Sequence, residues 1–162
     1  MEIEKNGVEE IETTPEQTQG LIRAYENDIL GGLLAAADFC KDADSVVDIE
    51  IVRKGMKYFS FKLRPLSEEE YQRCRNRNTK YVRNKQVGIK MPEDTNLSRY
   101  RSELIYTATM PDASGVKIWD TAGLWTKLNV LNGIDAVDKI LMAGEKDMVL
   151  SKLDEISGYE NN

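Results

Sequence analysis

The chain has 162 residues, 41% of them hydrophobic and 31% charged, with a formal net charge of −6, which predicts one globular domain with a sizeable core. No apolar run approaches the roughly 18 residues that span a bilayer, and the acidic start differs from a signal peptide, so we expect a cytoplasmic protein. The absence of histidine removes the commonest general base and metal ligand, which excludes most catalytic triads and zinc schemes.

Residues 1–20 hold six glutamates against one lysine and predict a disordered acidic tail, so the ordered domain is expected over residues 21–162. A helix is expected from Asp28 to Cys40 because apolar residues recur there at helical spacing. Gly31 and Gly32 each weaken this helix by about 1 kcal/mol relative to alanine. The residues on its apolar face are Ile29, Leu30, Leu33, Leu34 and Ala37.

Near residues 46–64 the pattern changes to the alternation of a β-hairpin with one apolar face. The turn is expected near Lys54 and Gly55. Pro65 ends the second strand because proline cannot donate a ladder hydrogen bond. The alternating apolar residues are Val47, Ile49, Ile51, Phe59, Phe61 and Leu63.

A capping box begins the next helix, because the Ser67 hydroxyl and the Glu70 carboxylate can each accept a hydrogen bond from a free backbone amide. This helix is expected to run toward Arg77. The stretch that follows is basic and interrupted by Gly88 and Pro92, so we expect an irregular, mobile connection there.

Helical spacing resumes at Leu97 and continues to Ala108, and Pro111 stops it. A turn over residues 112–115 leads to a segment that holds both tryptophans. Its apolar residues are expected to share one helical face: Leu124, Trp125, Leu128 and Leu131.

The closing residues 133–159 predict two short helices separated by Gly144. Together these elements predict the α+β fold class, as a mainly helical single domain with one N-terminal β-hairpin.

Residues 119–123 spell Trp-Asp-Thr-Ala-Gly, a sequence that small GTPases place near the γ-phosphate. Their mechanism also requires a phosphate-binding G-x-x-x-x-G-K-[ST] loop, and the chain has none upstream. Residues 84–87 (Asn-Lys-Gln-Val) lack the aspartate that would recognise guanine. We therefore expect no nucleotide hydrolysis, and instead expect Asp120 or Thr121 to start a helix with Trp119 packed beside it.

The acidic residues form no recognisable catalytic or metal site. Glu68–Glu70 lie at a helix start, where free amides and the helix dipole stabilise negative charge. Asp135 and Asp138, one turn apart, form a pair that is common on solvated helices. We expect no metal, no cofactor and no catalytic residue. Cys40 and Cys74 are interpreted as small buried or half-buried side chains, with a disulfide or a reactive thiol as the alternatives.

Residues 71–90 hold seven bases and no acid, so this is where a polyanion would bind. Tyr71 and Tyr81 interleave with the bases, which suits base stacking combined with phosphate contacts. The alternative is a solvated surface, or a contact with an acidic or amphipathic helical partner, and the acidic balance of the chain favours it over nucleic acid. The bases are Arg73, Arg75, Arg77, Lys80, Arg83, Lys85 and Lys90.

Three blocks occur in a characteristic order. Residues 61–66 (Phe-Lys-Leu-Arg-Pro-Leu) lead into Ser-Glu-Glu-Glu, residues 104–109 (Leu-Ile-Tyr-Thr-Ala-Thr) precede Pro111, and residues 141–145 (Leu-Met-Ala-Gly-Glu) precede residues 153–159 (Leu-Asp-Glu-Ile-Ser-Gly-Tyr). In these blocks the chain resembles phage tail assembly chaperones of the XkdN-like group, which occur in phages and prophages of Gram-positive bacteria. The resemblance covers roughly residues 45–159, and the region around Trp119–Trp125 departs from it.

The resemblance implies a non-enzymatic protein that binds the long, helical tape-measure protein and keeps it soluble until the tail tube polymerises around it. It implies action in the cytoplasm of the bacterial host and absence from the finished virion. The tail tube protein is a second candidate partner, and a homo-oligomer stays open. The candidate partner-binding residues are Trp119, Trp125, Leu128 and Leu131, with core packing as the commoner alternative for each.

Two other function classes remain as alternatives. A nucleic-acid-binding accessory protein using residues 71–90 would lose affinity steeply with salt, and also on neutralisation of Arg73, Arg75 and Arg77. An enzyme of unfamiliar type would need a polar pocket that holds a carboxylate with a strongly perturbed pKa.

Overall fold

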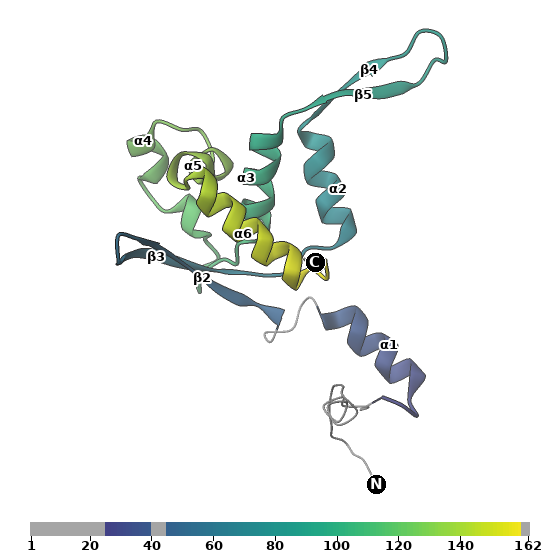
Figure 1. The fold of residues 1–162 in the computed structure, drawn as a ribbon, viewed down its shortest axis with the longest axis horizontal. Helices are drawn as coiled ribbons and strands as arrows, with labels where there is room; N and C mark the ends of the chain where they lie inside the picture. The colour runs from purple at the N-terminus through teal and green to yellow at the C-terminus, as the bar shows by residue number, and fades with distance from the viewer. Residues whose placement is uncertain (1–24, 40–44, 160–162) are drawn as a thin grey trace. The chain divides into compact units, whose positions relative to one another are not determined.

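The computed structural model describes residues 25–39 and 45–159 (Figure 1). The predicted acidic tail and Cys40 lie outside the described residues, so the boundary at residue 20 stays a prediction. The chain divides into two units, Met1–Phe39 and Cys40–Asn162, and we describe each by itself.

The described part of the chain contains helices and two small antiparallel sheets, which confirms the mainly helical α+β class. No described helix has the length and apolar character that crossing a membrane requires. The elements are α1 (Ile29–Asp38), β2 (Val47–Arg53), β3 (Met56–Leu63), α2 (Glu68–Arg77), β4 (Thr79–Arg83), β5 (Lys90–Thr95), α3 (Leu97–Ala108), η4 (Ile118–Asp120), α4 (Leu124–Leu128), α5 (Gly133–Ile140) and α6 (Ala143–Ile156).

Helix α1 is the element that the structure describes in the first unit, and it confirms the predicted helix. The Asp28 side chain accepts a hydrogen bond from the Gly31 amide at 3.0 Å, which satisfies one of the free amides of the first turn. None of its residues is buried. Its exposed apolar side chains are Ile29, Leu30, Leu33 and Leu34.

The predicted hairpin is formed by β2 and β3, which pair from Val47 opposite Leu63 to Arg53 opposite Met56. Lys54 (φ 53°) and Gly55 (φ 76°) make the turn, as predicted, because two consecutive positive φ angles match the twist of a two-residue hairpin. Leu63 also bridges to Thr109, which ties the end of the hairpin to the end of α3.

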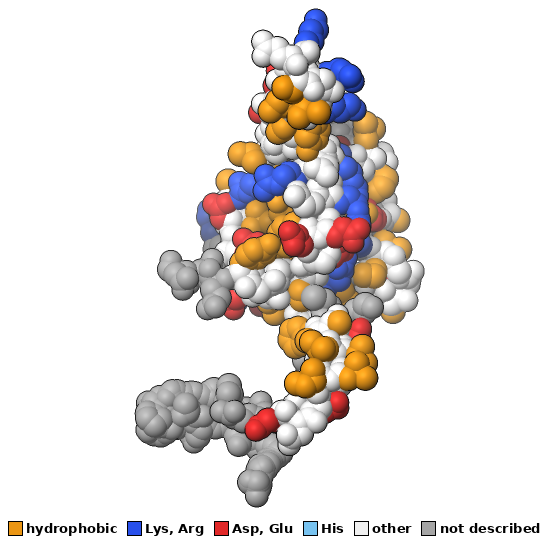
Figure 2. All heavy atoms as spheres, turned by 90° about the vertical axis from the view of Figure 1, so that its right-hand side faces the viewer, with side chains coloured by type: hydrophobic (Ala, Val, Ile, Leu, Met, Phe, Trp, Pro, Cys, Tyr) orange, Lys and Arg blue, Asp and Glu red, His pale blue; other side chains and the backbone are white. Residues whose placement is uncertain are grey.

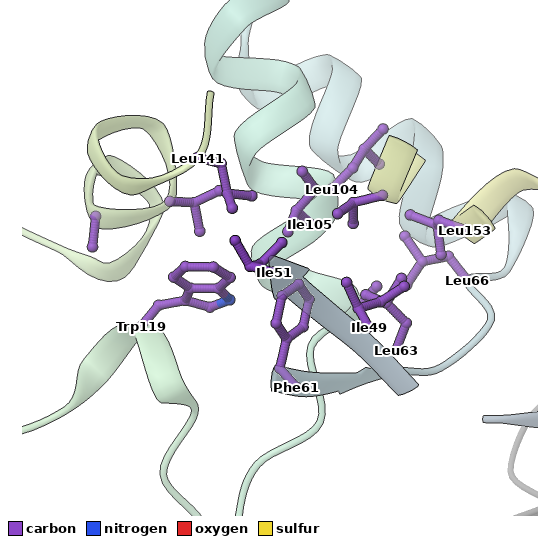
Figure 3. Packing of buried hydrophobic residues seen from close by; sticks show 14 of the residues in the cluster. Ile49, Ile51, Phe61, Leu63, Leu66, Leu104, Ile105, Trp119, Leu141 and Leu153 are labelled. Atoms are coloured by element: carbon purple, nitrogen blue, oxygen red, sulfur yellow. The ribbon is translucent and has the colours of Figure 1, made fainter. Parts of the chain in front are cut away.

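The core of the second unit lies between the β2–β3 hairpin and helices α3, α5 and α6 (Figure 3). Figure 3 shows Trp119 directed toward Ile51 and Phe61, so the short 3-10 helix η4 contributes the largest core side chain. The buried hydrophobic residues are Ile49, Ile51, Phe61, Leu63, Leu66, Cys74, Leu104, Ile105, Ala108, Trp119, Ala136, Val137, Leu141, Val149 and Leu153.

The predicted capping box at the start of α2 is confirmed. The Ser67 hydroxyl accepts from the Glu70 amide at 3.2 Å, and the Glu70 carboxylate accepts from the Ser67 amide at 3.0 Å. The Arg64 guanidinium donates two hydrogen bonds to the same carboxylate, at 2.7 and 3.1 Å, and these hold the pKa of Glu70 below its ordinary value. Helix α3 has the predicted bounds.

The break between the last two helices differs from the prediction. Gly144 lies within the first turn of α6, and the helices are separated by extended backbone at Leu141 and Met142. Burial of the Leu141 side chain and a hydrogen bond from the Met142 amide to Glu145 at 2.9 Å stabilise the break at that point. The local helix-breaking tendency of glycine was therefore the wrong signal.

The basic connection expected after α2 is instead a second hairpin, β4–β5, so the prediction of one hairpin was incomplete. Gly88 supplies the positive φ (73°) that the turn requires, and the Asn84 side chain accepts from the amides of Gln86 and Val87. Pro92 is tolerated because a two-stranded sheet has free edges. Figure 1 shows this hairpin extending beyond the ends of α2 and α3.

Candidate partner-binding surfaces

Trp119, the first predicted partner residue, belongs to the core. Its side chain is 1% exposed, and its indole N–H donates to the Thr109 hydroxyl at 2.8 Å. Its ring packs edge-on against Phe59 and Phe61, with centroid separations of 5.8 and 5.1 Å. The structure therefore matches the core alternative for this residue, and no face of Trp119 is open to a partner.

Trp125 lies at the surface, 36% exposed, and its indole N–H donates to the Trp119 carbonyl at 2.8 Å. With residues 120–123 and Thr126 it lines a shallow cavity of about 170 Å³. Trp125 thus combines an anchored ring with an open face, a common arrangement for a contact residue.

Leu128 and Leu131 are separated by the structure, although the sequence placed them on one helical face. Helix α4 ends at Leu128 because Asn129 adopts a left-handed conformation (φ 59°). Leu128 packs, half-buried, against the core, whereas Leu131 is 87% exposed. Of the four predicted residues, Trp125 and Leu131 are therefore the accessible ones.

The expected helix start at Asp120 or Thr121 is wrong. The Asp120 carboxylate instead accepts from the Tyr106 hydroxyl at 2.6 Å, and α4 starts after Gly123, whose positive φ (83°) sets the turn. Burial and this hydrogen bond raise the pKa of Tyr106 to about 12, so its hydroxyl stays protonated. Gly133 passes so close to this pair that a Cβ there would overlap both side chains.

The seven predicted bases fall into two groups, and the first group lies on α2. Arg73 pairs with Glu69 at 3.5 Å, and Arg77 pairs at 2.8 Å with Glu103, whose side chain is 2% exposed. The Arg75 guanidinium lies over the Tyr100 ring, 5.2 Å from its centroid. These bases already have partners within the chain, so they offer a polyanion less charge than the sequence suggested.

The second group lies on the β4–β5 hairpin. Lys80, near its base, pairs with Glu93 at 3.6 Å. Arg83 and Lys90 face each other across the strands at the other end, and Lys85 lies in the turn between them. No ion pair joins these three to any described residue. The hairpin end is therefore a local positive charge on an acidic chain.

The same hairpin carries exposed apolar side chains that the sequence analysis missed. Tyr81, Val82, Val87, Ile89 and Met91 are each at least 40% exposed, and no residue of either strand is buried. A signal was present, because Val87, Ile89 and Met91 alternate with Gly88 and Lys90 as in a strand.

A second cavity, of about 350 Å³, lies where α2, α3 and the end of α6 meet. The Tyr71 hydroxyl donates to Asp154 at 2.9 Å, and the Tyr71 ring packs edge-on against Tyr159 at 5.6 Å. Burial raises the pKa of both Tyr71 and Tyr100, so neither hydroxyl is activated as a base or nucleophile. The described residues contain no group of three or more acidic, cysteine or histidine side chains placed to hold a metal ion.

The model of the family described as phage XkdN-like tail assembly chaperone protein matches residues 32–162. The search of curated proteins and the search of solved structures found no match.

Proposed function

Because the chain belongs to the phage XkdN-like tail assembly chaperones, we propose that it binds the tape-measure protein, without catalysis, and keeps it soluble during tail assembly. The tape-measure protein is the long, helical partner that the sequence resemblance implies. Its apolar helical faces must be shielded from water until the tail tube surrounds them.

The observation that carries this proposal is the exposure of apolar side chains on elements that contribute nothing to the core. Helix α1 and the β4–β5 hairpin have no buried residue, yet both carry large apolar side chains. Exposed apolar side chains grouped in this way are typical of surfaces that bind another protein. Amphipathic helices bind such surfaces by laying their apolar face against them.

Co-expression with the tape-measure protein tests the proposal. We expect a complex that stays in the soluble fraction and whose mass, measured by size-exclusion chromatography with light scattering, gives the stoichiometry. A tape-measure protein that precipitates equally with and without this chain would refute the proposal. The tail tube protein, co-expressed in the same way, serves as the comparison partner.

We also propose that the chain acts in the host cytoplasm and leaves before the tail is complete. Mass spectrometry of purified virions and of the assembly extract then finds peptides of this chain in the extract alone. Stoichiometric recovery from washed virions would contradict this placement.

A further inference from the structure

We propose that the β4–β5 hairpin is a docking arm for an acidic, amphipathic helical segment of the tape-measure protein. This inference rests on the proposed function and adds the surface and the chemistry of the segment that it binds.

Among the described residues, hydrogen bonds near its base join the arm to the rest of the second unit. The Thr79 hydroxyl hydrogen-bonds the Thr95 hydroxyl at 2.8 Å, and the Asn96 amide donates to the Asn78 carbonyl at 2.8 Å. Beyond this base neither strand has a buried residue. A two-stranded hairpin is only marginally stable by itself in water, so an arm of this kind gains from a partner that covers it.

One face of the arm is apolar. Val82 and Met91 are paired across the strands and therefore project from the same face. The hydrogen bond from the Asn84 amide to the Ile89 carbonyl continues the ladder by one more pair. Ile89, two residues before Met91 on the same strand, therefore projects from that face as well. Two strands about 4.8 Å apart, with their side chains, make a face roughly as wide as a helix. Figure 2 shows hydrophobic side chains gathered along the arm, below a basic end.

The charge at the end of the arm selects the partner. Arg83, Lys85 and Lys90 contribute three positive charges, and the acids of the hairpin, Glu93 and Asp94, lie near its base opposite Lys80. Arg83 and Lys90 are the next pair after Val82 and Met91, so their side chains start from the other face of the arm, and Lys85 lies in the turn. A partner that covers Val82 and Met91 therefore reaches these bases with residues that extend past the turn and the edges of the two strands. Acidic flanking residues are favoured there, and basic ones are repelled.

The composition of the arm favours a protein over a nucleic acid. Binding of single strands relies on aromatic rings on which bases stack, and the arm has one, Tyr81, whose hydroxyl already donates to Asn76 at 2.8 Å. Its other exposed large apolar side chains, Val82, Val87, Ile89 and Met91, are not aromatic. These cover apolar groups well but offer a base no stacking platform.

The experiment measures binding of labelled peptides, tiled along the tape-measure protein, to the full chain by fluorescence anisotropy. We expect the bound peptides to be those with net negative charge and an apolar helical face, and their affinity to fall with salt. Three variants are compared with the wild type. The tip variant carries Arg83→Gln, Lys85→Gln and Lys90→Gln; the face variant carries Val82→Ser, Ile89→Ser and Met91→Ser; the control variant carries Lys54→Gln, Lys127→Gln and Lys139→Gln.

The tip variant should bind about tenfold more weakly at low salt, because three exposed ion pairs contribute a factor of about two each. The control variant loses the same charge from exposed sites outside the arm, and should bind within about twofold of the wild type. The face variant should also lose binding, with little salt dependence. Because no arm residue is buried, all variants should keep the wild-type circular dichroism spectrum and thermal midpoint.

The outcomes separate the two proposals. If the wild type keeps the tape-measure protein soluble while the tip and face variants bind its peptides as well as the control does, the arm proposal is wrong and the proposed function stands. If the wild type neither solubilises the protein nor binds any peptide, the proposed function itself fails. If the tip substitutions abolish binding to a short single-stranded RNA and leave peptide binding unchanged, the arm is a nucleic-acid surface and the inference is overturned.

Discussion

Substitution of Trp119 by phenylalanine tests whether this residue serves the core, as its burial indicates, or a partner. Phenylalanine keeps part of the contact with Phe59 and Phe61 but removes the indole N–H that donates to Thr109. The Thr109 hydroxyl keeps one hydrogen bond, because it also donates to the Ile105 carbonyl at 2.7 Å. The substitution therefore leaves the buried Thr109 hydroxyl with a hydrogen-bond partner.

The expected loss of stability follows from two contributions. The lost hydrogen bond costs about 1 kcal/mol, and the smaller ring leaves a cavity that costs about 1–2 kcal/mol, including the lost transfer energy. The free energy of unfolding should thus fall by about 2–3 kcal/mol. Trp125→Phe is the matched control, because its ring is 36% exposed, and it should cost about 1 kcal/mol or less.

Urea unfolding followed by far-UV circular dichroism measures both variants. With a slope of about 2 kcal/mol per molar urea, Trp119→Phe shifts the midpoint by about 1–1.5 M. The reasoning is refuted if Trp119→Phe unfolds at the wild-type midpoint but loses binding to the tape-measure protein, because Trp119 would then be a contact residue.

Three further predictions concern two glycines, an ion pair and the buried thiol of the second unit. Gly133→Ala should destabilise the fold by about 2 kcal/mol or more, because its methyl group overlaps the half-buried Tyr106 and Asp120 side chains. Gly144→Ala, with open space around its Cβ, should stabilise α6 by about 0.5–1 kcal/mol, and equal unfolding midpoints for the two variants would contradict this. The Arg53 guanidinium donates two hydrogen bonds to the Glu145 carboxylate, from Nη2 at 2.6 Å and from Nε at 2.8 Å, and these hold the pKa of Glu145 below its ordinary value. The stability that this ion pair contributes is therefore complete above the unfolded-state pKa of about 4.3 and is lost as the pH falls through the folded-state pKa. Urea midpoints measured from neutral to acid pH should therefore fall less for Glu145→Gln than for the wild type, and parallel curves would exclude this origin. Burial raises the pKa of the Cys74 thiol, so peptide mapping after iodoacetamide treatment should find it alkylated only under unfolding conditions, and rapid modification of the native protein would show that the site opens.

Much of the local structure was predictable because it depends on neighbours within one turn of helix or one hairpin. The capping box of Ser67 and Glu70 acts over three residues, and the turn at Lys54 and Gly55 is set by backbone conformation. The family was predictable for a related reason, since its ordered blocks are sequence features themselves.

The surfaces available to a partner were decided by tertiary structure. The sequence left open whether Trp119 faces a partner or the core, and contacts with Phe59 and Phe61 from a distant hairpin bury it. Likewise the second half of the basic segment forms the β4–β5 arm, because a turn at Asn84 and Gly88 brings Arg83 opposite Lys90.

The sequence alone therefore determined where most helices and the first hairpin lie, and which family the blocks resemble. Only the tertiary structure decided which apolar side chains are exposed and which bases are already paired, such as Arg77 with Glu103 and Lys80 with Glu93. The physical reason is that burial and ion pairing depend on the residues that meet in space, whereas the periodicity of a sequence reports only the face on which a side chain lies.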